Sequence, residues 1–335
     1  MSKLKIAIIG CGGMAGGHAR RLHDSPDVDL VGLCDVSEQV VESFIDRHLA
    51  ECESRPATFT QSAQLYDQLD PDAVFIVTPH TMHFGHCMEG LDRGCHVFVE
   101  KPMVTSAADA HALKARVEQT GKILVIGYNT PCTPEFVYLR RQIRDEAFGR
   151  LELISGYVVQ NWKTPTTGSW RQDPSLSGGG QAYDTGAHLL NSVCWSVESN
   201  VAQVHTFLDN HGTPVDVNSS INIRFENGVF AAVTIGGNCP ANSGYLMYAF
   251  ERGKIAVDGW SGGWIEVHDD HGRVKYPPIE GRPQSPAENF IDAILGRAEP
   301  RTHVVNGVVQ SELMDAIYES ASTGAPAGPS RTSTG

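Results

Sequence analysis

The chain has 335 residues, of which 41% are hydrophobic and 19% charged, a composition typical of a globular protein large enough for two domains. Its formal net charge of −13 disfavours nucleic acid or an anionic membrane surface as a partner. No apolar stretch approaches the roughly 20 residues that span a bilayer. Residues 1–9 are too short for a signal peptide, and the eight cysteines contain no Cys-x-x-Cys pair. We therefore expect a cytoplasmic protein with reduced cysteines.

Short apolar runs alternate with helical patterns over residues 1–127. The predicted strands are 6–9, 30–34, 73–77, 96–99 and 123–126. The predicted helices between them are 17–24, 37–49, 84–93 and 107–119. Strands that alternate with helices indicate crossover units and a parallel sheet. The fold class is α/β, and the first domain is predicted to span residues 1–127.

The pattern changes in residues 128–323, where several strands follow one another. A helix is predicted at 135–146, and strands at 151–159, 201–208, 219–225, 229–235, 245–250, 254–257 and 264–268. Two further helices, 287–295 and 307–322, end the domain. Successive strands joined by Gly and Asn turns indicate an α+β domain with a large, open, predominantly antiparallel or mixed sheet. Residues 324–335 are rich in Gly, Pro, Ser and Thr, and we expect them to be disordered.

A glycine-rich segment, GCGGMAGGHA, follows the first predicted strand and opens the first helix. It fits the dinucleotide-binding pattern G-x-G-x-x-A. Gly10 allows a tight turn, Gly12 allows the backbone to approach a pyrophosphate, and Ala15 allows close packing of helix on strand. The amino end of the helix supplies N–H groups and partial positive charge for the phosphates.

Asp35 ends the second predicted strand, about 20 residues after the glycine segment. A carboxylate at this position accepts hydrogen bonds from the adenosine ribose and repels a 2′-phosphate. The residues that follow, VSEQ, include no arginine to bind that phosphate. The sequence thus favours NAD as cofactor, with NADP as the alternative.

The turn after the third predicted strand, TPHTMH, contains two histidines, and His86 and Cys87 follow. These side chains suggest a metal site, but the segment has no HExxH pattern and no converging carboxylate. We expect no metal. The Thr78–Pro79 turn is instead predicted to line the cofactor site.

Lys101 follows the fourth predicted strand in the sequence HVFVEKP. In open α/β sheets, ligands bind beyond the carboxyl ends of the strands, so Lys101 is placed to face a cofactor. From the residues alone, an ordinary solvated Glu–Lys pair is an equal alternative.

Four segments of the chain, GCGGMAGGHA, VTPHTMH, HVFVEKP and GGGQAYDTGAHLLN, together resemble the Gfo/Idh/MocA oxidoreductases. The match runs from about residue 3 to residue 323. It implies a Rossmann domain followed by an open-sheet domain that often serves in oligomer formation. It also implies a nicotinamide cofactor and sugar, polyol or sugar-derived substrates. His80 and Ala15 stand where many relatives have asparagine and glycine.

The resemblance assigns Lys101 to the family's Glu-Lys-Pro lysine, and Asp184 and His188 to its Asp-x-x-x-His pair. If residues 183–195 are helical, Asp184 and His188 share one face and can address one substrate. The resemblance also implies that the peptide bond between Lys101 and Pro102 is cis.

The candidate residues form three groups. The catalytic candidates are Lys101, Asp184 and His188. The cofactor-binding candidates are Gly10, Gly12, Gly13, Met14, Ala15, Asp35, Thr78, Pro79, His80, His83, Glu100, Lys101 and Asn129. The substrate-binding candidates are Lys101, Trp170, Arg171, Asp184 and His188. Trp162 and Lys163 precede the glycine run, and Trp170 fits a sugar platform and a packing residue equally well.

The predicted reaction interconverts a secondary alcohol and a ketone by hydride transfer. Because histidine has a pKa of about 6.5, His188 is assigned as general acid/base. Lys101 stabilises charge on the reacting oxygen and Asp184 orients the substrate or His188; the roles of His188 and Lys101 could be exchanged. Two alternatives remain: redox-neutral NAD-dependent cleavage of a glycoside, and a non-catalytic NAD-binding regulator. An open sheet face needs covering, so a homo-dimer or homo-tetramer is expected.

Overall fold

The computed structural model describes residues 3–52 and 54–329 of the chain. The chain forms two compact units. Among these described residues, the first unit takes those within 1–104, 109–127 and 286–304, and the second takes those within 105–108, 128–285 and 305–335. Each unit has its own sheet and its own hydrophobic core.

The first unit is built on a six-stranded parallel sheet with the strand order β3-β2-β1-β4-β5-β6. This is the order of a Rossmann fold, as predicted. The strands are β1 (Leu4–Ile9), β2 (Val28–Cys34), β3 (Ala57–Phe59), β4 (Ala73–Ile76), β5 (His96–Val99) and β6 (Leu124–Ile126). Every residue of β4 is buried, because both faces of a parallel sheet are covered.

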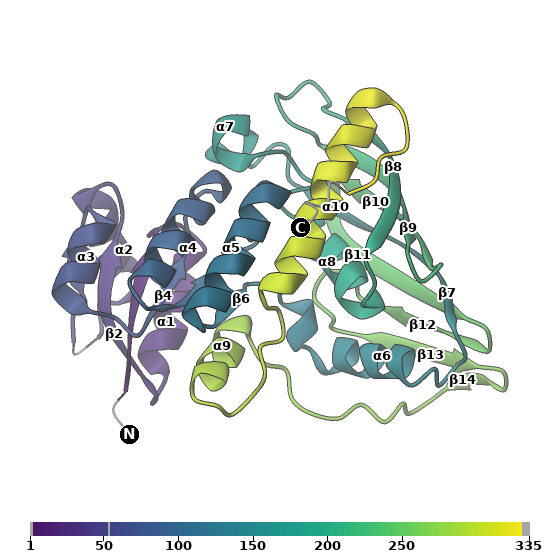
Figure 1. Cartoon of the computed structure of the whole chain (residues 1–335), viewed down its shortest axis with the longest axis horizontal. Helices are drawn as coiled ribbons and strands as arrows, with labels where there is room; N and C mark the ends of the chain where they lie inside the picture. Colours follow the sequence, from purple (N-terminus) through teal and green to yellow (C-terminus); the bar gives the residue numbers. More distant parts are fainter. Residues whose placement is uncertain (1–2, 53, 330–335) are drawn as a thin grey trace. The chain divides into compact units, whose positions relative to one another are not determined.

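In the described part of this unit, six α-helices lie beside the sheet (Figure 1). They are α1 (Ala15–Asp24), α2 (Glu38–His48), α3 (Ser62–Leu69), α4 (His83–Asp92), α5 (Ala107–Thr120) and α9 (Pro286–Ile294). Apolar side chains of α1, α2 and α9 form one core with inward residues of the strands, such as Phe75 and Phe98.

Three parts of the first unit differ from the sequence-based expectation. β3 and α3 were not predicted, because β3 has only three residues and two of them are exposed. The expected second domain, 128–323, is interrupted, because 286–304 packs with the first unit. Phe290 of α9 lies 5.6 Å from Phe75 and 5.9 Å from Phe98 between ring centroids, so the aromatic core holds this helix.

The second unit contains an eight-stranded mixed sheet with the order β14-β13-β12-β11-β7-β10-β9-β8. Strands β7 and β10 pair in parallel and the other neighbours are antiparallel, as expected for an open mixed sheet. The strands are β7 (Leu151–Asn161), β8 (Val201–Asp209), β9 (Asn218–Phe225), β10 (Phe230–Gly236), β11 (Asn238–Phe250), β12 (Gly253–Val257), β13 (Ile265–Asp269) and β14 (Gly272–Val274).

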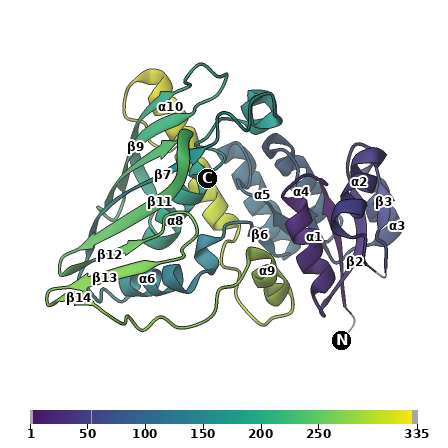
Figure 2. The ribbon, with the colours of Figure 1, turned by 180° about the vertical axis from the view of Figure 1, so that it is seen from behind.

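Three long helices of this unit, α6 (Pro134–Arg144), α8 (Gly186–Val197) and α10 (Val304–Thr323), lie on one side of the sheet (Figures 1 and 2). Their apolar side chains and those of the strands form the core. The short helix α7 (Pro174–Ser177) precedes the glycine run. On the other face of the sheet, Leu153, Phe207 and Phe230 are exposed, and each has a buried residue next to it in its strand.

The end of the described chain is ordered, in contrast to the prediction for 324–335. Ala327 is buried and pairs with Val204 of β8 through two backbone hydrogen bonds of 2.8 and 2.9 Å. The free backbone groups of an edge strand explain this pairing. The rest of that prediction, residues 330–335, lies outside the described residues. Within the described chain, no helix is long and apolar enough to cross a bilayer.

Candidate active site

The glycine loop after β1 has the geometry of a dinucleotide-binding turn. Gly10 has φ of +96°, and a Cβ there would lie 2.5 Å from the carbonyl oxygen of Val77, so only glycine fits. A Cβ on Gly12 or Gly13 would meet nothing within 4 Å. The loop therefore presents bare backbone to open space at the start of α1, where Ala15 is buried and Met14 is exposed. These features fit a bound pyrophosphate.

Asp35 lies directly after β2, beside this loop. Its Oδ2 accepts a hydrogen bond of 2.8 Å from the backbone N–H of Cys11. The carboxylate is thereby oriented by the glycine loop itself. This arrangement fits the predicted role of Asp35 at the ribose hydroxyls.

The turns after β4 and β5 are joined by His83, which begins α4. Its ring is fully buried, with Nδ1 2.8 Å from the Pro102 carbonyl oxygen and Nε2 2.9 Å from that of Thr78. Burial lowers the pKa of His83, which favours the neutral ring. A neutral ring donates to one of these two carbonyl oxygens and lies against the other, so it packs between the two turns. Its direct contact with a cofactor remains a prediction. Pro79 and His80 lie in the first of these turns.

Lys101 follows β5 and is partly buried. The Lys101–Pro102 bond is cis, which confirms the prediction. Because β1, β4 and β5 are parallel neighbours, Lys101 and the glycine loop both lie at the carboxyl ends of the strands. Glu100 is 8% exposed and accepts the backbone N–H of Lys101 at 3.2 Å. In the described residues, no group of three or more His, Cys, Asp or Glu side chains could hold a metal ion.

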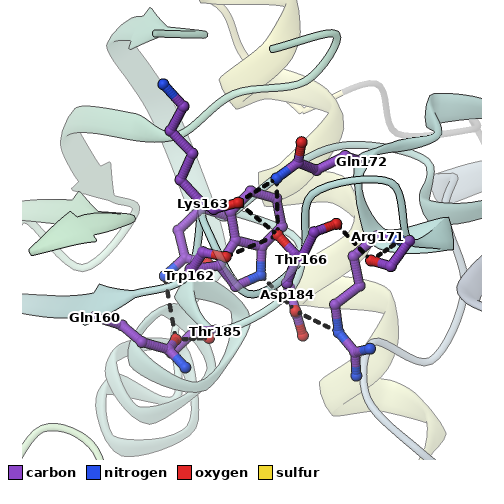
Figure 3. Close-up of polar contacts among 10 residues, drawn as sticks. Gln160, Trp162, Lys163, Thr166, Arg171, Gln172, Asp184 and Thr185 are labelled. Carbon is purple, nitrogen blue, oxygen red and sulfur yellow. Dashed lines mark hydrogen bonds and ion pairs between the residues drawn. The ribbon is translucent and has the colours of Figure 1, made fainter. Parts of the chain in front are cut away.

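In the second unit, Asp184 is a buried carboxylate with two donors from a preceding loop. Its Oδ2 accepts the indole N–H of Trp162 at 2.7 Å and the Nε–H of Arg171 at 3.0 Å (Figure 3). The guanidinium of Arg171 also lies over the ring of Trp170, 4.6 Å from its centroid. Both predicted substrate residues of the loop therefore lie beside Asp184 or its partner.

The loop that carries these donors is closed by its own hydrogen bonds. The side chain of Gln172 donates to the carbonyl oxygen of Lys163 at 2.7 Å and to the hydroxyl of Thr166 at 2.9 Å (Figure 3). The hydroxyl of Thr166 donates to the carbonyl oxygen of Trp162 at 2.8 Å. Trp162 is 2% exposed, so this end of the loop is fixed in the protein interior.

Helix α8 begins at Gly186, which corrects the predicted helix of 183–195. Asp184 lies in the turn before it, with its N–H bonded to the carbonyl oxygen of Gly180 at 3.0 Å. Asp184 and His188 therefore do not lie on one helix, because Asp184 belongs to the turn that precedes α8. His188 lies in the first turn of α8, with its ring edge-on to Tyr128 at 5.8 Å. Exposed Asn129 follows Tyr128.

Asp216 anchors the glycine run, a role that the sequence analysis missed. Its carboxylate accepts the backbone N–H groups of Gly180 and Ala182, both at 2.8 Å, and the hydroxyl of Tyr318. A Cβ on Gly180 would lie 1.9 Å from the carbonyl oxygen of Asp216. No motif surrounds Asp216, so the sequence held no signal for this contact. Lys101 belongs to the first unit, whereas Asp184 and His188 belong to the second.

Comparison with known proteins agrees with this architecture. Residues 4–128 match the model of an oxidoreductase family with an NAD-binding Rossmann fold. Residues 136–273 match the model of the GFO/IDH/MocA C-terminal domain. The chain therefore belongs to the Gfo/Idh/MocA oxidoreductase family.

Two curated relatives show the range of this similarity. D-Glucoside 3-dehydrogenase of Escherichia coli is 26% identical over 195 residues, which are 58% of this chain and 54% of that protein. Glycosyl hydrolase family 109 protein 2 of Akkermansia muciniphila is 27% identical over 194 residues, 55% of this chain and 41% of that protein. The chain thus spans about half the length of these relatives.

A solved structure shows the same fold over nearly the whole chain. The WlbA dehydrogenase of Bordetella pertussis, crystallised with NADH and UDP-GlcNAcA, has a TM-score of 0.82 and 20% identity. The alignment covers 98% of this chain and 100% of that one.

Proposed function

We propose that the protein is an NAD-dependent oxidoreductase that interconverts a secondary alcohol and a ketone on a sugar, polyol or sugar derivative. The observation that carries this proposal is the position of Lys101, at the same sheet edge as a glycine loop that fits a pyrophosphate. The sugar class is supported by relatives such as the D-glucoside 3-dehydrogenase. Trp170 and Arg171, beside Asp184, offer an aromatic face and a cation to such a substrate.

The glycine loop with Asp35 would hold the cofactor, and NAD, when bound, supplies the hydride acceptor. Asp35 favours NAD over NADP because its charge repels a 2′-phosphate. The remaining cofactor candidates of the first unit flank the loop on the turns after β4 and β5, and Asn129 is assigned by the sequence alone.

In the proposed reaction, His188 removes the hydroxyl proton from the substrate or returns it. Lys101 donates a hydrogen bond to the reacting oxygen and stabilises the charge that develops there. Asp184 orients the substrate, since Trp162 and Arg171 hold its carboxylate in place. Exchange of the proton-transfer role between His188 and Lys101 remains an alternative.

The test is a panel of aldoses, glycosides and inositols with NAD and with NADP, monitored for reduced cofactor at 340 nm. We expect at least one alcohol to be oxidised, with a preference for NAD. His188→Ala should lower turnover on it by several orders of magnitude and leave NADH affinity near that of the wild type. A silent panel would favour a non-catalytic NAD-binding regulator, and full activity of the variant would refute the assignment of His188.

Redox-neutral cleavage of a glycoside is the second candidate, and the similarity to a glycosyl hydrolase family 109 protein favours it. Such an enzyme returns the hydride to its product and accumulates no NADH. Release of the aglycone from a nitrophenyl glycoside, without added NAD, would distinguish it from a dehydrogenase.

We further propose that the chain forms a homo-dimer or homo-tetramer. The exposed Leu153, Phe207 and Phe230 support the sheet of the second unit as the contact. Light scattering of the purified protein measures the number of subunits.

A further inference from the structure

A buried histidine–glutamate pair joins the helix of the glycine loop to the turn after β5, which carries Lys101. His18 of α1 and Glu100 after β5 are 5% and 8% exposed. The Nε2 atom of His18 lies 2.7 Å from Oε1 of Glu100. Glu100 is one of the cofactor-binding candidates, but neither the binding of a pyrophosphate nor the proposed proton transfer assigns a role to its contact with His18.

The ring of His18 is held in an apolar setting. Its centroid lies 5.5 Å from that of Phe75 and 5.1 Å from that of Phe98. The Nδ1 atom is buried and has no hydrogen-bond partner among the described residues, so the polar contact of the ring is with Glu100. At 2.7 Å a proton lies between the two side chains, and the contact is a strong hydrogen bond.

Glu100 also accepts a hydrogen bond from the backbone of Lys101. While Oε1 faces His18, Oε2 accepts the backbone N–H of Lys101 at 3.2 Å. Gly127 lies against the same carboxyl group, because a Cβ on it would be 3.1–3.2 Å from three of its atoms. His18 and the backbone of Gly127 thus confine the carboxylate that binds the peptide of Lys101.

Stability does not explain such a pair. Removing two polar groups from water costs several kcal/mol, and well-packed apolar residues at such sites are often as stable or more so. Phe75 and Phe98 already provide an apolar setting for such a replacement. A role in fixing the geometry at Lys101 accounts for the pair better than a role in folding.

We propose that His18 is a positioning residue for Lys101. Through its hydrogen bond it fixes Glu100, and Glu100 fixes the peptide from which the Lys101 side chain extends. The consequence for catalysis rests on the proposed function, in which Lys101 contacts the reacting oxygen. The effect of His18 on the Lys101 peptide does not depend on the proposed function.

The experiment compares His18→Leu, which removes the polar contact, with His18→Gln, whose amide N–H can replace Nε2–H. His96→Leu is the matched control. His96 begins the same strand at its other end, where Nδ1 accepts the N–H of Ile123 at 3.0 Å. Hydrogen exchange of the Lys101 amide is measured by NMR, together with NADH affinity by fluorescence. Turnover is measured on the alcohol of the panel that is oxidised fastest.

We expect the Lys101 amide to exchange at least tenfold faster in His18→Leu and within threefold of wild type in the other two variants. Turnover should fall at least tenfold only in His18→Leu, with NADH affinity within twofold of wild type. Equal exchange in His18→Leu and wild type would overturn the proposal, as would equal effects of all three variants. Faster exchange in His18→Leu, together with no oxidation of any alcohol in the panel, would support the positioning role of His18 and refute the proposed oxidoreductase function.

A second variant covers the case that His18→Leu does not fold. Gly127→Ala leaves every polar group in place and presses its methyl against the Glu100 carboxyl group. We expect it to change the exchange rate of the Lys101 amide at least threefold. An unchanged rate would show that Glu100 does not control this peptide.

Discussion

Gly10 and Gly12 lie two residues apart in the glycine loop, yet alanine should affect them in opposite ways. Gly10 has φ of +96°, and the added methyl would lie 2.5 Å from the Val77 carbonyl oxygen. The left-handed conformation costs about 1–2 kcal/mol for a residue with a Cβ. Relief of the overlap costs about 1–3 kcal/mol more. We expect Gly10→Ala to lower the free energy of unfolding by about 2–5 kcal/mol.

Gly12 has neither a left-handed backbone nor an overlap with a neighbouring atom. It is not among the glycines with positive φ, and a Cβ on it would contact nothing. Gly12→Ala should therefore raise the free energy of unfolding by about 0.4–1 kcal/mol, because the unfolded chain loses freedom. The methyl does enter the space through which the backbone approaches a pyrophosphate. NADH affinity should fall at least tenfold, or about 1.4 kcal/mol.

Urea unfolding followed by circular dichroism and NADH titration by fluorescence measure the two effects separately. Binding of NADH by Gly12→Ala with the affinity of the wild type would refute the role of Gly12 at the pyrophosphate. Equal stability of Gly10→Ala and the wild type would show that the overlap with Val77 does not exist.

Two further predictions concern polar groups of the interior. A double-mutant cycle of Trp162→Phe and Asp184→Ala, in urea, should give a coupling energy of about 1.5–3 kcal/mol for their 2.7 Å hydrogen bond; additive losses would contradict it. Burial lowers the pKa of His83 from 6.5, so the unfolded chain binds a proton below about pH 6.5 that the native state does not. As the pH is lowered below about 6.5, the contribution of His83 to the free energy of unfolding should decrease by up to about 1.4 kcal/mol per pH unit. Burial also lowers the pKa values of His48, His86 and His96, so His83→Gln should lose only the part of this slope that comes from His83. Identical pH profiles of unfolding in the variant and the wild type would contradict the contribution of His83.

The Rossmann unit was predictable because its strands are buried on both faces and appear as continuous apolar runs. The short edge strand β3 was not, since Ala57 and Thr58 are exposed and carry no such pattern. The unit to which α9 belongs could not be predicted either. Its apolar face indicates burial but does not specify which core it joins, and Phe290 joins the aromatic core of the first unit.

The candidate site was predictable only where function is tied to a local motif. The glycine loop and the Lys101 turn are each a single short segment that follows a predicted strand. The partners of Asp184 lie 13 and 22 residues before it, in a loop without a regular pattern. The predicted helix start failed for a related reason. Gly180 and its neighbours fold into turns on Asp216, which lies 36 residues further along the chain.

Three of the proposed functional groups, Lys101, Asp35 and Asp184, share one physical arrangement, in which a second polar group fixes each of them before any ligand arrives. Glu100 binds the peptide of Lys101, and Cys11 donates its N–H to Asp35. Trp162 donates to Asp184. Groups that are already oriented need not reorganise as charge develops, which is why preorganised polar sites stabilise transition states more than water does. The supporting residues therefore set the geometry that the motif residues require, and they are the positions at which a conservative substitution should separate binding from turnover.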